Sequence, residues 1–177
     1  MVTDCCPFIT ISRQAGAGGC TVADAVAALL AQDRDLAGPA GWQVHDADVD
    51  AGGGVPVPAH RAFHSVRELA TAGHGVIVGR GGVMLTRDLP QGVHVRLIAP
   101  REVRIDRLSA RHHIDREQAF AAIGEQDASR ARLFREYFQR EIDDPSLYDA
   151  VFNTARLPAA SIAAAIAQMV RDRVSAL

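Results

Sequence analysis

The residues best suited to chemistry form a glycine-rich loop near the start of the chain, at residues 13–21. An apolar, β-branched run at residues 8–11 precedes the loop, and residues 22–30 carry apolar side chains at the i, i+4, i+7 and i+8 spacing of a helix. In a strand–loop–helix unit, N–H groups of the loop and of the first helical turn converge on an anion such as phosphate. The pattern therefore predicts a phosphate-binding loop. The alternative is a glycine-rich turn that only lets the helix pack closely on the strand.

The side chains of this loop depart from the usual phosphate-binding motif, G-x-x-x-x-G-K-[ST]. Gly16, Gly18 and Thr21 keep the shape of the motif. Gly19, however, stands where the lysine that reaches the outer phosphates belongs, and Arg13 stands at the first glycine. Thr21 could hold Mg²⁺ through its hydroxyl or serve only as a hydroxyl at the start of a helix. The loop thus keeps the residues that shape it around a phosphate, but it lacks the lysine that is the main cation of the motif.

The chain contains no lysine, so all 19 of its basic residues are arginine. Every cationic contact to a phosphate must then come from a guanidinium, which is permanently charged and suited to bidentate contact with oxygen. The formal net charge of −2 argues against the strongly basic surface of a nucleic-acid-binding domain. A length of 177 residues predicts one domain with a substantial core.

Other arginines occupy positions from which they could reach a ligand. Arg80 lies between glycines directly after the apolar strand expected at residues 76–78, so it is either a ligand contact at a strand end or an exposed turn residue. On the next helix, Arg104, Arg107 and Arg111 fall within roughly 60° of one another at about 100° per residue. This basic face could close over phosphates as a lid, or it could be a solvated face with no partner.

Asp127 and Arg130 form a charged pair on the aromatic face of the long helix expected over about 115–140, which also carries Phe134. Charged groups on a core-facing stripe are normally paired or bound to a ligand. The two residues are therefore either ligand contacts or an internal i,i+3 ion pair.

The elements that must position these residues alternate between strand and helix. We expect strands at residues 8–12, 42–45, 76–78, 93–98 and 148–152, and helices at about 20–31, 61–72, 100–111, 115–140 and from 158 onwards. Because the strands are apolar throughout, the pattern predicts an α/β fold with a parallel sheet covered by helices on both faces. Ligands of such sheets bind at the carboxyl ends of the strands, where the glycine loop and Arg80 both fall. Residues 47–60, rich in Asp, Gly and Pro, are expected to form a flexible loop.

The remaining composition narrows the class of protein. Neither the three cysteines nor the seven histidines have the spacing of metal ligands, which makes a protein-held metal site improbable. The chain carries neither a signal-peptide pattern nor an apolar run of membrane-spanning length. We therefore expect a soluble, cytoplasmic protein that does not bind membranes.

Four ordered motifs resemble those of the cytidylate kinase-like family, relatives of bacterial cytidylate kinase among the P-loop nucleoside monophosphate kinases. The family's I-T-I-S-R-x-x-G-S-G-G-R, V-I-V-G-R-G-A, D-x-x-R and D-P-x-x-Y-D-x-x-x-N-T are similar to residues 9–20, 76–82, 127–130 and 144–154. The resemblance covers most of the chain.

This resemblance implies a three-layer P-loop NTPase fold with about five parallel strands, in one domain over residues 1–177. It implies that ATP and Mg²⁺ bind at the loop, through Arg13, Gly16, Ala17, Gly18, Gly19, Cys20 and Thr21. It also implies an acceptor nucleotide held by Arg80 and Asp127. A lid-like helical region at about 100–140 would contribute Arg107, Arg111 and Arg130, which with Arg13 would stabilise the transferred phosphoryl group.

The chain departs from the resemblance at charged positions. Cytidylate kinases have Lys at the position of Gly19 and Asp at the positions of Val78 and Gly81, and the kinase-like family has Arg at the position of Cys20. The segment before residue 61, where the family carries its acceptor-binding insertion, is also short. We expect phosphoryl transfer from ATP to a nucleoside monophosphate such as CMP, or to a similar small acceptor. A catalytically silent nucleotide sensor or partner-binding module is the alternative, and a relic of the fold without a ligand is the third.

Overall fold

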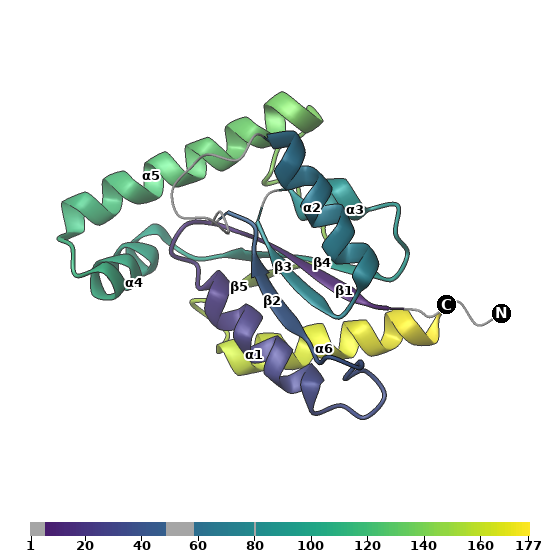
Figure 1. Cartoon of the computed structure of the whole chain (residues 1–177). Coiled ribbons are helices and arrows are strands. Elements are labelled where there is room, and N and C mark those ends of the chain that lie inside the picture. The colour runs from purple at the N-terminus through teal and green to yellow at the C-terminus, as the bar shows by residue number, and fades with distance from the viewer. Residues whose placement is uncertain (1–5, 49–58, 80) are drawn as a thin grey trace.

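A computed structural model describes residues 6–48, 59–79 and 81–177, with the side chains of the second segment described from Phe63. One sheet of 5 parallel strands, in the order β2-β3-β1-β4-β5, forms the middle layer (Figure 1). The strands are β1 (Phe8–Arg13), β2 (Gln43–Asp46), β3 (Gly75–Val78), β4 (Gly92–Ile98) and β5 (Ala150–Asn153).

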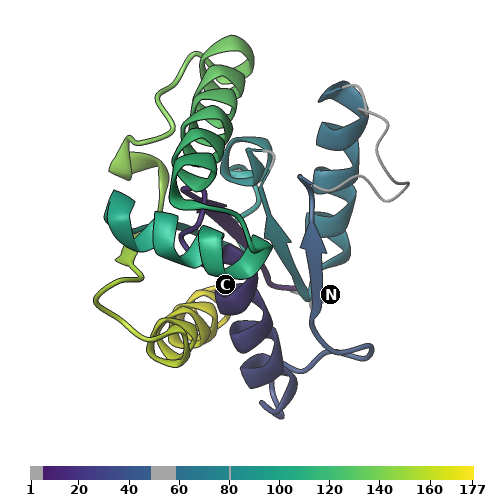
Figure 2. The ribbon, with the colours of Figure 1, turned by 90° about the vertical axis from the view of Figure 1, so that its left-hand side faces the viewer.

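Helices cover both faces of this sheet. Helices α1 (Gly19–Ala31) and α6 (Ala159–Ser175) lie on one face, and α2 (Ala59–Ala72) and α3 (Gly82–Thr86) lie on the other (Figure 1). Helices α4 (Arg101–His112) and α5 (Arg116–Leu133) form a hairpin at the carboxyl edge of the strands, the edge that Figure 2 views. The parallel α/β prediction is thus confirmed. Among the described residues, no helix is both long enough and apolar enough to cross a membrane.

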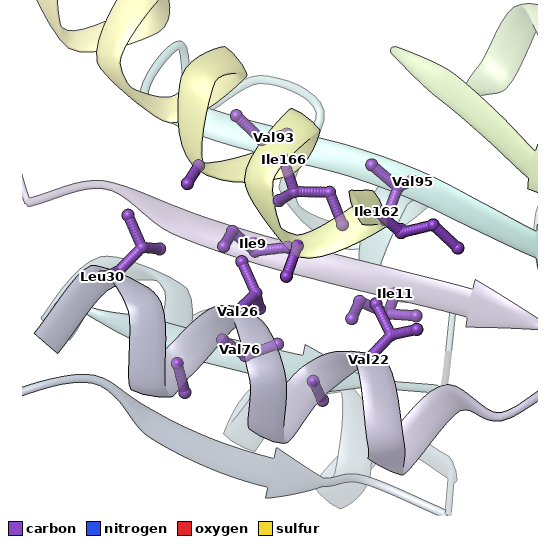
Figure 3. Close-up of a cluster of buried hydrophobic side chains, with 14 of the residues drawn as sticks. Ile9, Ile11, Val22, Val26, Leu30, Val76, Val93, Val95, Ile162 and Ile166 are labelled. Atoms are coloured by element: carbon purple, nitrogen blue, oxygen red, sulfur yellow. The ribbon is translucent and has the colours of Figure 1, made fainter. Parts of the chain in front are cut away.

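The main core lies between the sheet and the helices α1 and α6. Side chains alternate along a strand, so Ile9 and Ile11 of β1 face these helices while Phe8 packs on the opposite face. The α1 residues at the predicted helical spacing and two isoleucines of α6 fill this layer with aliphatic side chains: Val22, Val26, Leu30, Ile162 and Ile166 (Figure 3). The apolar spacing in the sequence therefore identifies the faces that become buried.

Three local features differ from the sequence expectations. Helix α3 was not expected, because its 5 residues are too few to show a helical period. The helix expected over 115–140 ends at Leu133 and gives way to a π-helical turn, Phe134–Phe138, whose first residue packs in a cluster with Val83 and Ile142. Helix α2 begins at Ala59, so the loop expected over 47–60 is shorter. Its central residues, 49–58, lie outside the described residues, as does Arg80.

Candidate functional site: a cleft lined by arginines

The glycine loop joins the end of β1 to the start of α1. Gly16 and Gly18 have φ angles of 75° and 82°, in the left-handed region that favours glycine. The Ala17 N–H donates to the Gln14 carbonyl over 3.1 Å, which closes the turn, and Gly18 is the N-cap of α1. The first amides of a helix have no acceptor within it, so this loop presents N–H groups to an anion.

A cleft of about 1120 Å³ lies against this loop. The loop residues expected to bind nucleotide all line it, from Arg13 through Thr21. Arg107 and Arg111 of α4 and Arg130 of α5 line the same cleft. The structure therefore brings four of the arginines selected from the sequence to one cleft, although they come from three different elements. The volume is sufficient for a nucleotide.

Arg13 occupies the space above the position where the usual motif has its lysine. A Cβ atom placed on Gly19 would lie 3.1 Å from Arg13 Cγ and 3.3 Å from Arg13 Cδ, so the arginine stem covers this glycine. The guanidinium is 9% exposed, with Nη1 lying 2.9 Å from Asp48 Oδ2 and Nη2 lying 3.5 Å from Asp46 Oδ1. Arg13 is thus a cation held in place by two carboxylates at the edge of the cleft.

These two carboxylates are the site residues that the sequence analysis missed. Asp46 ends β2 and pairs in register with Val78 of β3. The strand-end acid that is absent from β3 is therefore present on the neighbouring strand. The rule that ligands bind at carboxyl ends of parallel strands would have selected Asp46, had it been applied to β2 as it was to β1 and β3. Asp48 follows two residues later and lines the cleft beside it.

Arg130 points from α5 toward the same carboxylate. Its Nε donates to Asp48 Oδ2 over 3.3 Å, and its Nη2 lies 3.2 Å from that oxygen. Burial, and then the positive charge of Arg13, lowers the pKa of the Arg130 guanidinium. Within the described part of the chain, Arg130 Nη1 is buried and has no hydrogen-bond partner. A buried donor without an acceptor is unfavourable, so an oxyanion from a ligand would stabilise this group.

The two arginines of α4 that line the cleft are held differently. Arg107 is fixed, since its Nη1 donates to Thr154 Oγ1 and its Nη2 to the Thr154 carbonyl, both over 2.8 Å. Its Nη1 lies 4.0 Å from where a Cβ on Gly18 would be, so it stands directly over the loop. Arg111 is exposed in the last turn of α4. The solvated-face interpretation of this stripe therefore does not hold for Arg107.

Asp127 contacts the glycine loop itself. Its Oδ1 accepts from the Ala15 N–H and its Oδ2 accepts from Arg104 Nη1, both over 2.7 Å. The expected i,i+3 pair is present only as a long contact, with 3.9 Å between Asp127 Oδ1 and Arg130 Nη1. Both oxygens of Asp127 are therefore engaged by protein groups.

A second, smaller cavity of about 40 Å³ adjoins the cleft. It shares Leu133 and the charged residues Arg13, Asp48 and Arg130 with the cleft. Its other lining residues are Thr10, Ile11 and Ser12 of β1, the glycines Gly79, Gly81 and Gly82, and the apolar residues Val83, Phe134 and Ile142. The Ser12 hydroxyl accepts a hydrogen bond over 2.7 Å from Arg96, which is buried beneath it. The three shared charged residues stand where the two cavities meet.

The residue types in the cleft fit a magnesium ion that arrives with phosphate. No group of three or more His, Cys, Asp or Glu side chains suited to a metal occurs in the described segments. Mg²⁺ is commonly held by one or two carboxylates together with water and the phosphates of a substrate, so it does not need such a group. The Thr21 hydroxyl and the Asp46 carboxylate both line the cleft and are ligands of the required kind.

Comparisons with known proteins support the same family as the four sequence motifs. The model of the cytidylate kinase-like family matches residues 59–156. The cytidylate kinase of Natronomonas pharaonis is 30% identical over 161 residues, which cover 85% of this chain and 82% of that protein. The cytidylate kinase of Methanocaldococcus jannaschii is 32% identical over 91 residues, which are 50% of this chain and only 51% of that protein.

Solved structures share the fold at low sequence identity. An uncharacterized protein from Eubacterium ventriosum has a TM-score of 0.73 at 20% identity, with 93% of this chain and 98% of that chain covered. Shikimate kinase from Acinetobacter baumannii has a TM-score of 0.57 at 18% identity, with 94% of each chain covered. The sheet order, the glycine loop and these similarities all describe a P-loop NTPase fold. The extent of the match to its sequence model makes this chain a member of the cytidylate kinase-like family.

Proposed function

We propose that this protein transfers the γ-phosphoryl group of ATP to a nucleoside monophosphate such as CMP, or to a similarly small acceptor, in the cytoplasm. The proposal rests on one observation. The cleft at the glycine loop is lined by four arginines, Arg13, Arg107, Arg111 and Arg130. Phosphoryl transfer requires mainly positioning and neutralisation of the phosphate charge, and this cleft is built for both. Membership of a family with relatives named cytidylate kinase supports the same chemistry.

On the donor side, the triphosphate binds to the loop amides that end at Thr21. Arg13 takes the role of the missing lysine, because its stem lies over Gly19 and its guanidinium lines the cleft. Arg107 and Arg111 approach from α4. Mg²⁺, held by Thr21 and Asp46 with the phosphates, supplies further charge neutralisation when it is bound.

On the acceptor side, the reacting oxygen enters between the cleft and the smaller cavity, where Arg130 Nη1 has no acceptor of its own among the described residues. The acceptor oxygen forms a bond to the γ-phosphorus, the bond from that phosphorus to the β–γ bridging oxygen breaks, and ADP leaves. A monophosphate oxygen is already ionised near neutral pH, so no protein group needs to remove a proton. Arg80, which follows β3, is the further acceptor contact in this proposal.

The first test is a calorimetric titration of ATP, with and without Mg²⁺, into the wild type, Arg13→Ala and Arg132→Ala. Arg132 is exposed on α5 and lines neither cavity, so it controls for the loss of one positive charge. We expect binding that weakens in Arg13→Ala only. A coupled assay with CMP, dCMP, UMP and AMP then measures turnover, which Arg13→Ala should lower by about 10³-fold or more. Absence of ATP binding in the wild type would contradict the proposal.

A paired substitution tests whether Arg13 acts in place of the lysine. The double variant Arg13→Gly with Gly19→Lys restores the first glycine and the lysine of the usual motif, and it removes the stem that would collide with a side chain at residue 19. We expect this double variant to recover most of the ATP affinity that Arg13→Gly loses. Gly19→Lys alone should bind less well than the double variant, because Arg13 still fills the space.

A catalytically silent nucleotide-binding module is the second candidate. The observation that favours it is the pairing of Arg13 with two carboxylates, which neutralise its charge before any nucleotide binds. ATP binding without turnover on any of the four acceptors would favour this candidate over the kinase.

A further inference from the structure

The α4–α5 hairpin holds one residue of the glycine loop, Ala15, by both of its backbone polar groups. The Ala15 N–H donates to Asp127 Oδ1 over 2.7 Å, and Arg104 Nη1 donates to the Ala15 carbonyl over 3.1 Å. The two side chains also contact each other, because Arg104 Nη1 donates to Asp127 Oδ2 over 2.7 Å. We call Ala15, Arg104 and Asp127 together the Ala15 clasp.

Two members of the clasp, Ala15 and Arg104, are buried in the hairpin, whereas the Asp127 side chain is 30% exposed. The Ala15 methyl group is 2% exposed and packs in a cluster that the hairpin supplies, formed by Ile105, Leu108, Ala119 and Ile123. Arg104 is 6% exposed, and its Nε donates to the Ala99 carbonyl over 3.0 Å. The hairpin therefore surrounds a loop residue with its own small core.

The residues on either side of Ala15 are also held by contacts with the end of β4 and the start of α4. The Gln14 N–H donates to the Leu97 carbonyl over 3.0 Å, and Gln14 Oε1 accepts from the Ala99 N–H over 3.1 Å. A Cβ on Gly16 would lie only 2.7 Å from the Arg104 carbonyl oxygen, so the backbones of the loop and of α4 touch. Three consecutive loop residues are thus held against the end of β4 and the start of α4.

We infer that Arg104 and Asp127 are positioning residues, which hold the glycine loop in its phosphate-binding conformation without touching the nucleotide. The inference rests on the proposed function, in which this loop binds phosphate. Amides that are already fixed lose less conformational freedom when an anion binds, and they bind it more tightly. Both oxygens of Asp127 are engaged by the clasp, so its role differs from the acceptor contact that the family resemblance implies.

The substitution Asp127→Asn separates these two roles. The amide keeps the size of the side chain but removes the charge that Arg104 requires. If the clasp positions the loop, the KM for ATP and the Kd for ADP rise about 10- to 100-fold, while the KM for the acceptor changes little. If Asp127 instead contacts the acceptor, the acceptor KM rises and the ADP affinity is unchanged, which overturns the inference. Glu125→Gln is the matched control, because it removes the same charge from an exposed position of α5.

Amide hydrogen exchange provides a readout that requires no nucleotide. We expect faster exchange at Ala15 in Asp127→Asn than in the wild type, with unchanged exchange in β1 and α1. Glu125→Gln should exchange at the wild-type rate. Unchanged exchange at Ala15 in Asp127→Asn would contradict the clasp directly.

A second variant covers the case in which Asp127→Asn fails to fold. Arg104→Lys keeps the positive charge but cannot make the contacts to Ala99, Ala15 and Asp127 together. The same rise in ADP Kd and the same faster exchange at Ala15 are expected. If the wild type binds no nucleotide, the proposed function fails, and exchange at Ala15 alone decides whether the clasp holds the loop.

Discussion

Two regions of this molecule are held together by different forces. Between the sheet and the helices α1 and α6, aliphatic side chains such as Ile9, Leu30 and Ile166 are fully buried (Figure 3). At the carboxyl edge of the sheet, arginines and carboxylates join the loop, β2, α4 and α5, as in the contacts Arg13–Asp48 and Arg104–Asp127. The first region excludes water, whereas the second surrounds a cleft of about 1120 Å³.

The difference indicates which property each region controls. Burial of apolar area is nondirectional and accounts for most of the stability of a fold. Charged hydrogen bonds fix direction and distance, but much of their energy is offset by loss of hydration. We therefore expect substitutions in the aliphatic region to change the free energy of unfolding, and those at the carboxyl edge to change ligand binding more than stability.

The largest loss of stability is expected from Ile166→Ala in the aliphatic region. Ile166 is 0% exposed between α6 and the sheet, and removal of its buried methyl groups leaves a cavity. The free energy of unfolding should fall by about 2–5 kcal/mol, measured by urea denaturation. Nucleotide affinity of the folded fraction should be unchanged, since the side chain is remote from the cleft. A large drop in affinity at equal folded fraction would contradict the separation of the two regions.

A buried polar residue within the sheet gives the next largest effect. Burial lowers the pKa of His94 from 6.5 to about 4, and its Nδ1 lies 2.8 Å from Thr10 Oγ1. As the pH falls from 6.5 toward 4, the unfolded chain binds a proton that the folded chain does not, so stability decreases. The loss from this group approaches about 3 kcal/mol by pH 4.

Denaturation curves at pH 7 and pH 4.5 test this expectation in the wild type and in His94→Gln. The difference in unfolding free energy between the two pH values should be smaller in the variant. Burial also lowers the pKa of His45 and His74, so some dependence of the same sign should persist. An equal pH dependence in the two proteins would show that His94 has the same pKa in the folded and the unfolded chain, which contradicts the lowering by burial.

A smaller effect on stability, with a larger one on binding, is expected from Gly16→Ala at the carboxyl edge. The residue has a φ of 75°, and its new Cβ would press on the Arg104 carbonyl. The left-handed conformation alone costs about 1–2 kcal/mol for an L-residue. Because the loop must move away from α4, we expect the loss of binding free energy for ADP to exceed the loss of unfolding free energy. Calorimetry and denaturation of the same sample compare the two quantities.

The smallest effect is expected on the outer face of the same hairpin. Arg116 is exposed and pairs with Glu102, at 2.6 Å between Nη2 and Oε2, and with Asp106. Because exposed pairs contribute little, Arg116→Ala should change the unfolding free energy by about 0–1 kcal/mol. ADP affinity should not change. A loss of affinity as large as that expected for Arg104→Lys would mean that the hairpin as a whole, and not the Ala15 clasp, positions the loop.

The sequence predicted the aliphatic region better than the carboxyl edge. Helix α1 and strand β4 could be located because many successive residues repeat one apolar period, which averages over local exceptions. Helix α3 and the π-helical turn at Phe134–Phe138 are each only 5 residues long, so a period of that kind could not identify them. Long periodic segments are therefore predictable, and short or irregular ones are not.

The sequence predicted only part of the candidate site, because it reveals local patterns but not which distant residues come into contact. Local context selected Arg13 and Arg130, and the structure places both at one cleft. Their partner Asp48 was missed, because it is 35 residues from one arginine and 82 from the other along the chain and only the sheet order brings them together. For Asp127 the sequence left open a ligand contact or an ion pair with Arg130, and in the structure its hydrogen bonds are to Ala15 and Arg104.

The class of fold, the glycine loop and the use of arginine as its cation depend on residue type and short-range spacing, so they could be inferred from the amino-acid sequence. Which carboxylate faces which guanidinium depends instead on how the chain packs in three dimensions. Ion pairs and hydrogen bonds act over a few ångströms in space, but their partners here are distant along the chain, by 23 positions for Arg104 and Asp127 and by 82 for Arg130 and Asp48. The packing of the sheet and the hairpin sets those distances, and with them the shape of the cleft.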